Sequence, residues 1–245
     1  MKKLMGIDIG GTKCAVLLAE AGAFSDVRFI EKTAFPTDAE KGFNHTREKI
    51  FSAVTALTEK YGAGNISAIG VCCGSPLDSR RGVIKSPPNL PGWDNIPITQ
   101  MLYDCFGIPA YLQNDANACA LAEWRLGAGR GAENMIFLTM GTGFGAGIIA
   151  HGKIIEGKDG LCGEIGHVRL APDGPEGYGK SGSAEGFCSG GGIAKLALIM
   201  ADRWEAGGDA PVWINEKDDM DAKRLAEYAA NGDRHAVAVY EKAGE

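Results

Sequence analysis

The amino-acid sequence predicts an α/β fold with two lobes of duplicated architecture and a ligand cleft between them. A strand, a glycine turn and a second strand occur near the start of the chain and again near its middle. Predicted helices alternate with apolar strands, and glycine clusters separate many of the apolar runs. With 245 residues, 45% of them hydrophobic, the chain is long enough for one large domain or two modest ones. A ligand site between two lobes is the natural expectation.

Composition and charge argue against several classes of protein. A net charge of −6 is unfavourable for binding nucleic acid or an anionic membrane. No apolar stretch reaches the ~18 residues that a membrane span needs, and the opening apolar run is too short for a signal peptide. The seven cysteines are odd in number and lack CxxC spacing, which indicates reduced thiols in a cytoplasmic protein.

The first half of the chain begins with a predicted hairpin. Residues 4–9 and 14–19 are apolar runs on either side of a glycine turn. Residues 42–61 carry apolar side chains at helical spacing, which predicts a helix. Residues 66–73 predict a buried strand that ends at Gly-Ser-Pro. Residues 86–93, SPPNLPGW, are too rich in proline for regular structure and predict a shaped loop.

The second half begins with a predicted strand and a capped helix. Residues 110–112 predict the strand, and Asn-Asp-Ala-Asn at 114–117 caps a helix predicted at 118–125. Residues 134–150 repeat the opening hairpin, with the turn GTGFGAG between two apolar runs. Three further helices are predicted, at residues 192–206, 218–230 and 234–242.

The motif DIGGTK is the first candidate for chemistry. Asp8 stands at a strand end, where it would hold Mg²⁺ through water, since magnesium usually keeps several of its waters. Gly10 and Gly11 let backbone N–H groups point at phosphate oxygens, and Thr12 adds a hydroxyl donor. Lys13 completes the candidate phosphate-binding set. The alternative is an ordinary hairpin with a glycine turn.

The motif MGTGFGAG is the second candidate, with Gly141, Thr142 and Gly143 as its phosphate-binding residues. Glycines at alternate positions make poor strand material without a close ligand, although tight packing within a sheet is the alternative. The two glycine turns together are more specific than either alone, and the pair resembles the superfamily of actin, heat-shock proteins and sugar kinases. The duplication predicts lobes of residues 1–117 and 118–245.

Asp115 lies between a predicted strand and a predicted helix, within the motif NDANACALAE. Its simplest role is that of a helix N-cap. A cap needs only one such residue, however, and Asn114 and Asn117 flank Asp115. A carboxylate held by neighbouring amides near two phosphate-binding turns suits a general base, which would take a proton from a sugar hydroxyl during phosphoryl transfer.

The motif GEIGH places Glu164 and His167 three residues apart, so that both can face one side of a helical turn. A carboxylate and an imidazole suit vicinal sugar hydroxyls, each of which donates and accepts hydrogen bonds. Glu185 follows at a distance and joins this set. The alternatives are a surface glutamate and a satisfied core histidine. The glycines around Glu164 and before His167 argue against both.

These motifs, in this order and at this spacing, resemble those of the ROK (repressor, open reading frame, kinase) family. The resemblance rests on DIGGTK, SPPNLPGW, NDANACALAE, GTGFGAG and GEIGHVRLAPDGP, and covers roughly residues 5–195. It implies an actin-like ATPase fold of duplicated ribonuclease H-like units, with mixed sheets flanked by helices. It also implies ATP and Mg²⁺ as cofactors, a hexose as substrate, and a homodimer.

The resemblance implies roles for individual residues as well. It makes Asp115 the catalytic base for a glucokinase-like reaction at the terminal 6-hydroxyl of a hexose. It implies that the two glycine turns are the phosphate loops. The sugar ligands that it implies are Asn89, Asn114, Glu164, His167 and Glu185. Which hexose is bound stays open, with glucose as the default within the family.

The sequence departs from the family pattern where zinc is expected. Family members typically place three cysteines after the PDGP segment, and these bind zinc together with the histidine. Glu176, Tyr178 and Ser183 stand at those positions, and Cys188 lies outside them. Structural zinc normally needs four ligands, so His167 alone would not hold it and no bound zinc is expected. A backbone carbonyl or Tyr178 is then expected to orient the imidazole.

The second departure is at the end of the sequence. Family members continue into a glycine-rich strand and a helix that contact the adenosine, and this sequence stops at Glu245, ahead of them. Two alternatives to an active kinase stay open: a degenerate, non-catalytic sugar-binding protein and a truncated regulator. A repressor would need a helix-turn-helix before the sugar domain, and DIGGTK begins at Asp8, which leaves no room for one in this sequence.

Overall fold

The computed structural model describes residues 2–22 and 26–245. The chain divides into two compact units, and each is described here by itself. The first unit holds Met1–Phe137 and Gly147–Cys162, and the second unit holds Leu138–Ala146 and Gly163–Glu245.

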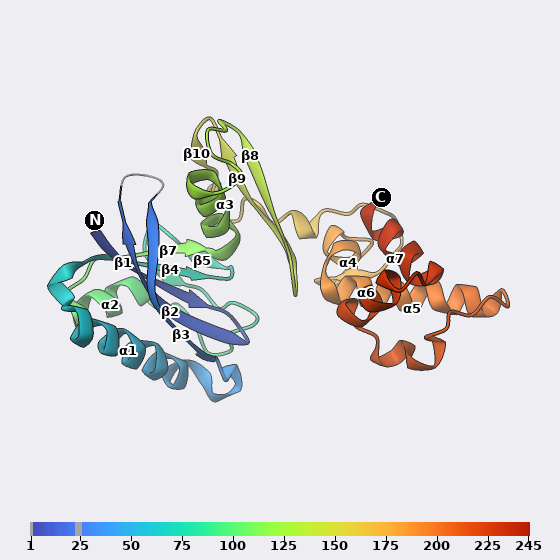
Figure 1. The fold of residues 1–245 in the computed structure, drawn as a ribbon, viewed down its shortest axis with the longest axis horizontal. Helices are drawn as coiled ribbons and strands as arrows, with labels where there is room; N and C mark the ends of the chain where they lie inside the picture. The colour runs from blue at the N-terminus through green and yellow to red at the C-terminus, as the bar shows by residue number, and fades with distance from the viewer. Residues whose placement is uncertain (1, 23–25) are drawn as a thin grey trace. The chain divides into compact units, whose positions relative to one another are not determined.

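A five-stranded mixed sheet forms the centre of the first unit, in the order β3-β2-β1-β4-β7 (Figure 1). Its strands are β1 (Lys2–Ile9), β2 (Lys13–Ala21), β3 (Val27–Pro36), β4 (Ile66–Cys73) and β7 (Ala110–Asn114). The first three strands pair antiparallel, whereas β1, β4 and β7 run parallel. The predicted opening hairpin and the strands predicted at residues 66–73 and 110–112 are confirmed, although the second of these strands extends to Asn114. Strand β3 is not among the predicted elements.

The alternation of side chains along the strands separates the two faces of this sheet. Ile7 and Ile9 of β1, like Ile69 and Val71 of β4, are buried in one hydrophobic core. Successive side chains of a strand point to opposite faces, so Asp8 projects from the face opposite this core. The sequence pattern thereby places a carboxylate outside the core at the end of the central strand.

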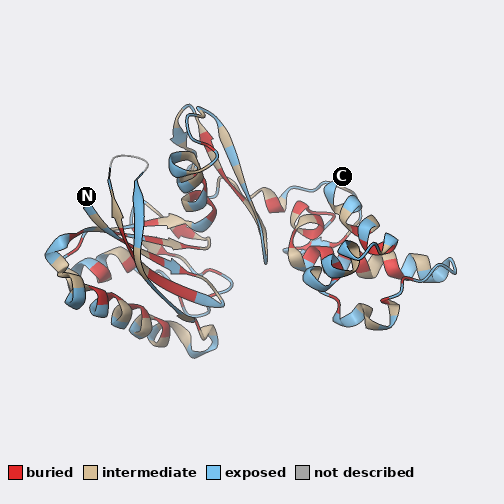
Figure 2. Cartoon of the chain, viewed as in Figure 1, coloured by how far each residue is buried: buried red, intermediate tan, exposed pale blue. Residues whose placement is uncertain are grey.

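Helices α1 (Gly42–Tyr61) and α2 (Ile98–Phe106) cover the core face of the sheet (Figure 1). Helix α1 has the predicted bounds, and Ile50, Val54 and Leu57 form the buried stripe that its spacing predicts, as Figure 2 shows along this helix. Burial of each such side chain contributes roughly 1.5–3 kcal/mol to stability. Helix α2 is not among the predicted elements.

The proline-rich loop at residues 86–93 contains neither helix nor strand, as predicted. The N–H group of Ser86 donates to the carbonyl of Trp93 at 2.9 Å, which closes the loop. Trp93 is fully buried, and its ring meets the ring of Phe43 edge-on at 5.0 Å between centroids. These contacts hold the loop in one shape without periodic hydrogen bonds. The short elements nearby are η1 (Ala39–Lys41), η2 (Ala63–Asn65), β5 (Leu77–Asp78) and β6 (Val83–Ile84).

Helix α3 (Asp115–Leu126) follows β7 directly. Its predicted start at residue 118 is wrong, because the cap is Asn114, whose Oδ1 accepts a hydrogen bond from Asn117 N at 3.0 Å. The predicted second hairpin is confirmed by β8 (Met135–Met140) and β9 (Phe144–Ala150), which form a three-stranded sheet with β10 (Lys153–Ile154).

One glycine of the second hairpin serves packing rather than a ligand. A Cβ added at Gly147 of β9 would lie 2.4 Å from the Cβ of Ala120 and 2.6 Å from the carbonyl oxygen of Ala116. Only glycine therefore permits this approach of β9 to α3. For Gly147 the alternative interpretation, tight packing, is the one that the structure supports.

The second unit includes the turn end of the β8–β9 hairpin, and from Gly163 onward it is mainly helical, with two short strands. The elements after Gly163 begin with η3 (Ile165–His167), β11 (Glu176–Gly177), β12 (Lys180–Ser181) and α4 (Ala184–Cys188). They are followed by α5 (Gly190–Ala206), η4 (Ile214–Asp219), α6 (Ala222–Ala230) and α7 (Arg234–Gly244). The three predicted helices are confirmed, although α6 begins only at Ala222 because Asp221 caps it. Trp213 and Leu225 are fully buried in the core of these helices.

The lobe boundary between residues 117 and 118 stays a prediction about the architecture of the whole protein. Within the described parts of the chain, no helix combines the length and the apolar character that crossing a membrane requires.

Candidate functional site

The carboxyl ends of the parallel strands bring two candidate carboxylates to one edge of the sheet. Strand register pairs Asp8 of β1 with Cys72 of β4, and Cys72 with Gln113 of β7. Asp115 follows β7 by one residue. The pKa of the Cys72 thiol lies well above its ordinary value. Burial has the largest effect, and the charges of Asp8 and Asp115 add to it. The same thiol lies 3.5 Å from Asp8 Oδ1. Both carboxylates therefore act on one small region.

Asp115 is exposed at the first turn of α3, and neighbouring amides orient its carboxylate. Its Oδ1 accepts hydrogen bonds from Ala116 N at 2.8 Å and from Asn114 Nδ2 at 3.1 Å. Asn114 Nδ2 also donates to Ser75 Oγ at 3.1 Å. The helix cap is supplied by Asn114, so capping does not account for a carboxylate at Asp115. An exposed, oriented carboxylate at a helix start is able to accept a proton.

Gln113 and Glu156 form hydrogen bonds next to Asn114 and Asp115, and neither is among the predicted site residues. Gln113 Oε1 accepts from Asn114 N at 2.8 Å, and Gln113 Nε2 donates to Glu156 Oε1 at 3.0 Å. Both residues line a pocket of about 600 Å³ that also includes Asp8 and Cys72. The only sequence signal for Gln113 is its place directly before the NDAN motif.

The first glycine turn makes close backbone contacts that exclude side chains. A Cβ added at Gly10 would lie 2.8 Å from the carbonyl oxygen of Lys13, and one at Gly11 would lie 2.7 Å from the Cβ of Asn89. The proline-rich loop thus lies directly against this turn. The structure brings Asn89, a predicted sugar ligand, together with the predicted phosphate loop, while Thr12 and Lys13 are exposed.

In the second unit, the second glycine turn lies against Glu185. Phe144 N donates to Glu185 Oε2 at 3.2 Å, and a Cβ added at Gly143 would lie 2.9 Å from the same oxygen. Gly190 N, at the start of α5, donates to the carbonyl of Gly141 at 2.9 Å. The structure therefore brings Gly141, Gly143 and Glu185 together, with Thr142 exposed between the glycines.

The GEIGH motif forms one turn of 3₁₀-helix that packs on β9. Gly163 has a φ of 98°, and a Cβ there would lie 2.1 Å from the carbonyl oxygen of Ala146. A Cβ at Gly166 would lie 3.3 Å from the Cβ of Glu185. His167 N donates to the carbonyl of Glu164 at 3.3 Å, as a helical turn requires. The glycines thus let both predicted sugar ligands approach the region of Glu185.

The imidazole of His167 is stacked on an aromatic ring. The ring of Tyr178 lies 4.5 Å from it between centroids, at an interplanar angle of 28°. Lys180 Nζ donates to the His167 carbonyl at 2.7 Å. Tyr178 and Lys180 belong to the β11–β12 hairpin, so this hairpin contacts His167 on both its ring and its backbone.

The residues present around His167 do not fit a zinc ion. Within residues 2–22 and 26–245, no group of three or more His, Cys, Asp or Glu side chains is placed to hold a metal. Ser183 Oγ caps α4 by accepting from Gly186 N at 3.1 Å, and Tyr178 stacks on His167. Tyrosine and serine at these positions do not supply the sulfur ligands that structural zinc sites use.

The predicted site residues form one group in each unit. The first unit contains Asp8, Gly10, Gly11, Thr12, Lys13, Asn89, Asn114 and Asp115. The second unit contains Gly141, Thr142, Gly143, Glu164, His167 and Glu185. Each group is coherent within its own unit, and its roles in ligand binding stay predictions.

Comparison with known proteins gives one family and consistent relatives. A model of the ROK family matches residues 4–245. The chain is 31% identical to a glucokinase of Thermotoga maritima over 98% of this chain and 74% of that protein. It is 35% identical to an N-acetylmannosamine kinase of Citrobacter koseri, over 79% of this chain and 63% of that protein.

A solved structure matches the chain in three dimensions as well. The ROK family glucokinase of Streptomyces griseus, solved in complex with glucose and AMPPNP, gives a TM-score of 0.73 at 29% identity. The match covers 98% of this chain and 75% of that one. This likeness confirms the predicted α/β class and the ribonuclease H-like, actin-like ATPase architecture.

Proposed function

The chain belongs to the ROK family and is a sugar kinase, and we propose that it transfers the γ-phosphoryl group of ATP to a hexose hydroxyl with Asp115 as general base. One observation carries the assignment of the base. Asp115 is exposed after β7, at the same sheet edge as Asp8 and separated from it by β4, and Asn114 already provides the helix cap. Its carboxylate is therefore available for proton transfer.

The first glycine turn and Asp8 are the proposed site for the nucleotide phosphates. Backbone N–H groups of Gly11 to Lys13 are suited to phosphate oxygens, because the two glycines leave the turn unshielded by side chains, whereas Gly10 N donates to the Lys13 carbonyl within the turn. Mg²⁺, when bound, neutralises charge that develops on the phosphates. Asp8, exposed at the end of β1, would hold the ion through water. Gly141, Thr142 and Gly143 form the second proposed phosphate loop.

In the proposed reaction, the protein acts mainly by positioning the reactants and by stabilising the charge that develops on them. Asp115 accepts the proton of the substrate hydroxyl while the hydroxyl oxygen attacks the γ-phosphorus of ATP, and ADP leaves. Two hydrogen bonds to Asp115 Oδ1 fix the carboxylate in place, which reduces the reorientation needed during proton transfer. The base alone typically contributes ~10²–10⁴-fold to such a rate.

The proposed sugar ligands are amides, carboxylates and one imidazole, which suit an alcohol-rich substrate. They are Asn89, Asn114, Glu164, His167 and Glu185. The hexose itself is proposed only as a class, with transfer to its 6-hydroxyl. A thermal-shift screen of glucose, mannose, fructose, N-acetylmannosamine and N-acetylglucosamine identifies the substrate, because a bound ligand raises the melting temperature.

The test of the base is the substitution Asp115→Asn, measured by ADP release with the hexose found in that screen. The turnover number should fall by roughly 10²–10⁴-fold, and hexose affinity should change little, because an amide keeps the hydrogen bonds but does not take the proton. Asp104→Asn is the matched control, since Asp104 is exposed on α2 and lies outside the candidate site.

Each outcome of this test has one meaning. A turnover number for Asp115→Asn within a few-fold of the wild-type value contradicts the base assignment. Hexose binding without any ADP release by the wild-type chain contradicts the kinase proposal and favours a sugar-binding protein.

The proposal also includes a homodimer, to be checked by light scattering, and a cytoplasmic location, which agrees with seven free cysteines.

A further inference from the structure

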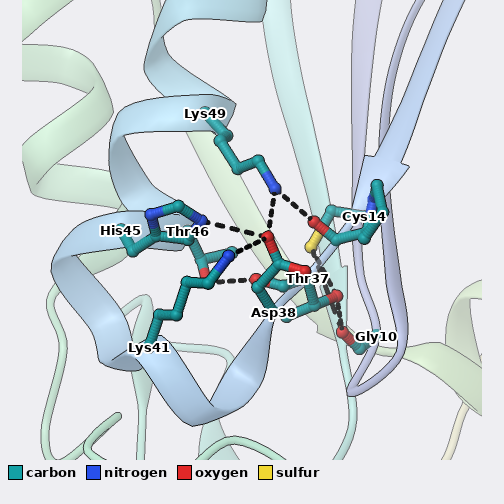
Figure 3. Close-up of polar contacts among 9 residues, drawn as sticks. Gly10, Cys14, Thr37, Asp38, Lys41, His45, Thr46 and Lys49 are labelled. Carbon is teal, nitrogen blue, oxygen red and sulfur yellow. Dashed lines mark hydrogen bonds and ion pairs between the residues drawn. The ribbon is translucent and has the colours of Figure 1, made fainter.

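A buried threonine that the proposed site does not use lies beneath the first glycine turn. Thr37 follows β3 and is fully buried. Its Oγ1 donates to the carbonyl of Gly10 at 2.6 Å (Figure 3). Its N–H donates to the carbonyl of Thr12 at 3.0 Å. One residue therefore binds both ends of the Gly10–Thr12 segment.

Helix α1 holds Thr37 in this position. Thr46 Oγ1 donates to the Thr37 carbonyl at 2.9 Å, and this contact is buried. Lys49 Nζ donates to the carbonyl of Pro36 at 2.8 Å. Cys14 Sγ lies 3.3 Å from Thr37 Oγ1, which closes the network on the side of β2. The position of Thr37 is thus determined by packing and by bonds from two other elements.

The next residue, Asp38, adds a charged anchor to the same segment. Its Oδ2 accepts from Lys49 at 2.8 Å, from His45 at 3.1 Å and from Lys41 at 3.2 Å (Figure 3). These donors hold the pKa of Asp38 well below its ordinary value, Lys49 having the largest effect. Asp38 has a φ of 50°, in the left-handed region, so the chain reverses sharply between Thr37 and α1.

Fixing a carbonyl also fixes the N–H group of the same peptide. The peptide unit is planar and trans, so its C=O and N–H bonds point in opposite directions. The bond from Thr37 Oγ1 to the Gly10 carbonyl therefore turns the N–H of Gly11 away from the buried side. The bond to the Thr12 carbonyl does the same for Lys13 N. Without these bonds the two glycines would allow several orientations, because glycine restricts its backbone least.

We propose that Thr37 is a positioning residue that pre-orders the first glycine turn so that its N–H groups face the nucleotide phosphates. This inference rests on the proposed function of that turn. Thr37 touches no ligand; it acts through the Gly10–Gly11 and Thr12–Lys13 peptides. A turn ordered before binding does not have to be ordered by the nucleotide, which improves affinity.

The test compares two substitutions that differ in the hydroxyl. Thr37→Val keeps the branched shape and the N–H but removes the hydroxyl, which leaves the part-buried Gly10 carbonyl with only the weak donor Cys14 Sγ at 4.0 Å. Thr37→Ser keeps the hydroxyl. Thr33→Val is the control, because Thr33 is exposed on β3, the strand that Thr37 follows. Binding of Mg-ADP is measured by calorimetry, ATP and hexose kinetics by ADP release, and order in the turn by hydrogen exchange of peptides covering residues 5–13.

Thr37→Val should weaken Mg-ADP binding and raise KM for ATP by roughly ten-fold, since the part-buried Gly10 carbonyl loses its strong donor and the turn loses the bond that orients it. Hydrogen exchange of the backbone N–H groups of residues 10–13 should accelerate. KM for the hexose should stay within about two-fold of the wild-type value. Thr37→Ser should restore nucleotide binding and slow exchange. Thr33→Val should behave as the wild type.

The opposite results are equally clear. A lower melting temperature for Thr37→Val with unchanged exchange and unchanged Mg-ADP affinity overturns the proposal, since Thr37 would then be structural only. An equal loss of Mg-ADP affinity in Thr37→Val and Thr37→Ser also overturns the proposal. If the wild type binds Mg-ADP but phosphorylates no hexose, a loss of affinity in Thr37→Val still supports the inference while the kinase proposal fails. If the wild type binds no nucleotide, both fail.

Discussion

At the scale of single residues, Cys119 reports the charge on Asp115, because the two lie one helical turn apart on α3. Partial burial of the sulfur raises the pKa of the Cys119 thiol, and the charges of Asp115, Asp8 and Glu123 raise it further, while the residue as a whole stays exposed to reagent. Asp115→Asn removes one of these charges, so the pKa of Cys119 should fall and its thiolate fraction should rise at fixed pH. Alkylation of Cys119 by iodoacetamide should then be faster.

The measurement is the rate of modification of the Cys119 peptide, followed by mass spectrometry at pH 8 or below. Asp104→Asn should leave that rate unchanged. A rate that is unchanged or slower in Asp115→Asn would mean that residue 115 carries no charge next to this thiol, contrary to its role as an ionised base. The result is independent of any assay for sugar or nucleotide.

At the scale of single residues, only some members of the candidate site could be predicted from the sequence. Asp115 and Glu185 stand out because polar residues follow strand ends or interrupt glycine-rich stretches. Thr37 gives no such signal, since its partners Gly10 and Cys14 lie far from it in sequence and are joined to it only when β3 pairs with β2. A hydroxyl that serves a distant backbone carbonyl has no local pattern.

At the scale of elements, strong periodicity decided which predictions succeeded. Helix α1 has its predicted bounds, and its buried residues recur at helical spacing from Thr46 to Leu57. Strand β3 alternates weakly, and its residues are mostly exposed at the edge of the sheet, so no apolar pattern marks it. Helix α2 has nine residues, as α6 does, but unlike α6 it has no side-chain cap to mark its start in the sequence. Tertiary packing supplies what these segments lack.

The β11–β12 hairpin is an element that the sequence did not predict, and it contacts a proposed sugar ligand. Its turn places Tyr178 at a φ of 51° and Gly179 at a φ of 72°, both in the left-handed region. Two-residue hairpins of this kind favour Asn or Gly in the turn, so a tyrosine there is strained. The strain is offset by the stack on His167, which indicates that the ring itself has a role.

We predict that Tyr178 orients His167 for the hexose in place of a metal. Tyr178→Asn suits the left-handed backbone but removes the ring, so KM for the hexose should rise roughly two- to ten-fold, as expected for a lost aromatic pair. Tyr178→Phe keeps the ring and should match the wild type. The measurement is the hexose dependence of ADP release, with KM for ATP as the internal reference.

Treatment with a zinc chelator, followed by return of Mg²⁺, should leave these kinetic constants unchanged. Elemental analysis that finds one zinc per chain, or a hexose KM for Tyr178→Asn equal to the wild-type value, would contradict the prediction. A rise in both KM values would point instead to general loss of structure in the second unit.

At the scale of the whole molecule, the described chain contains two separate hydrophobic cores. Leu102 is fully buried in the core between α1, α2 and the five-stranded sheet of the first unit. Leu225 is fully buried in the helical core of the second unit. The two clusters share no residue, so the loss of packing in one does not directly remove a contact in the other. The sequence predicted two lobes from its repeated hairpin, but not that the second core would be built mainly from helices, with Trp213 and Met220 added from the segments on either side of η4.

Leu102→Ala and Leu225→Ala are therefore a matched pair, the same substitution at equal burial in different cores. Each should cost about 2–5 kcal/mol of stability, because a cavity forms where the side chain is removed. Each should also lower protection from hydrogen exchange chiefly within its own unit, since local opening follows the cooperative unit that loses packing. Exchange measured by mass spectrometry on peptides from both units decides this. If either variant lowers protection equally in both units, the chain unfolds as one cooperative body and the two cores are not independent.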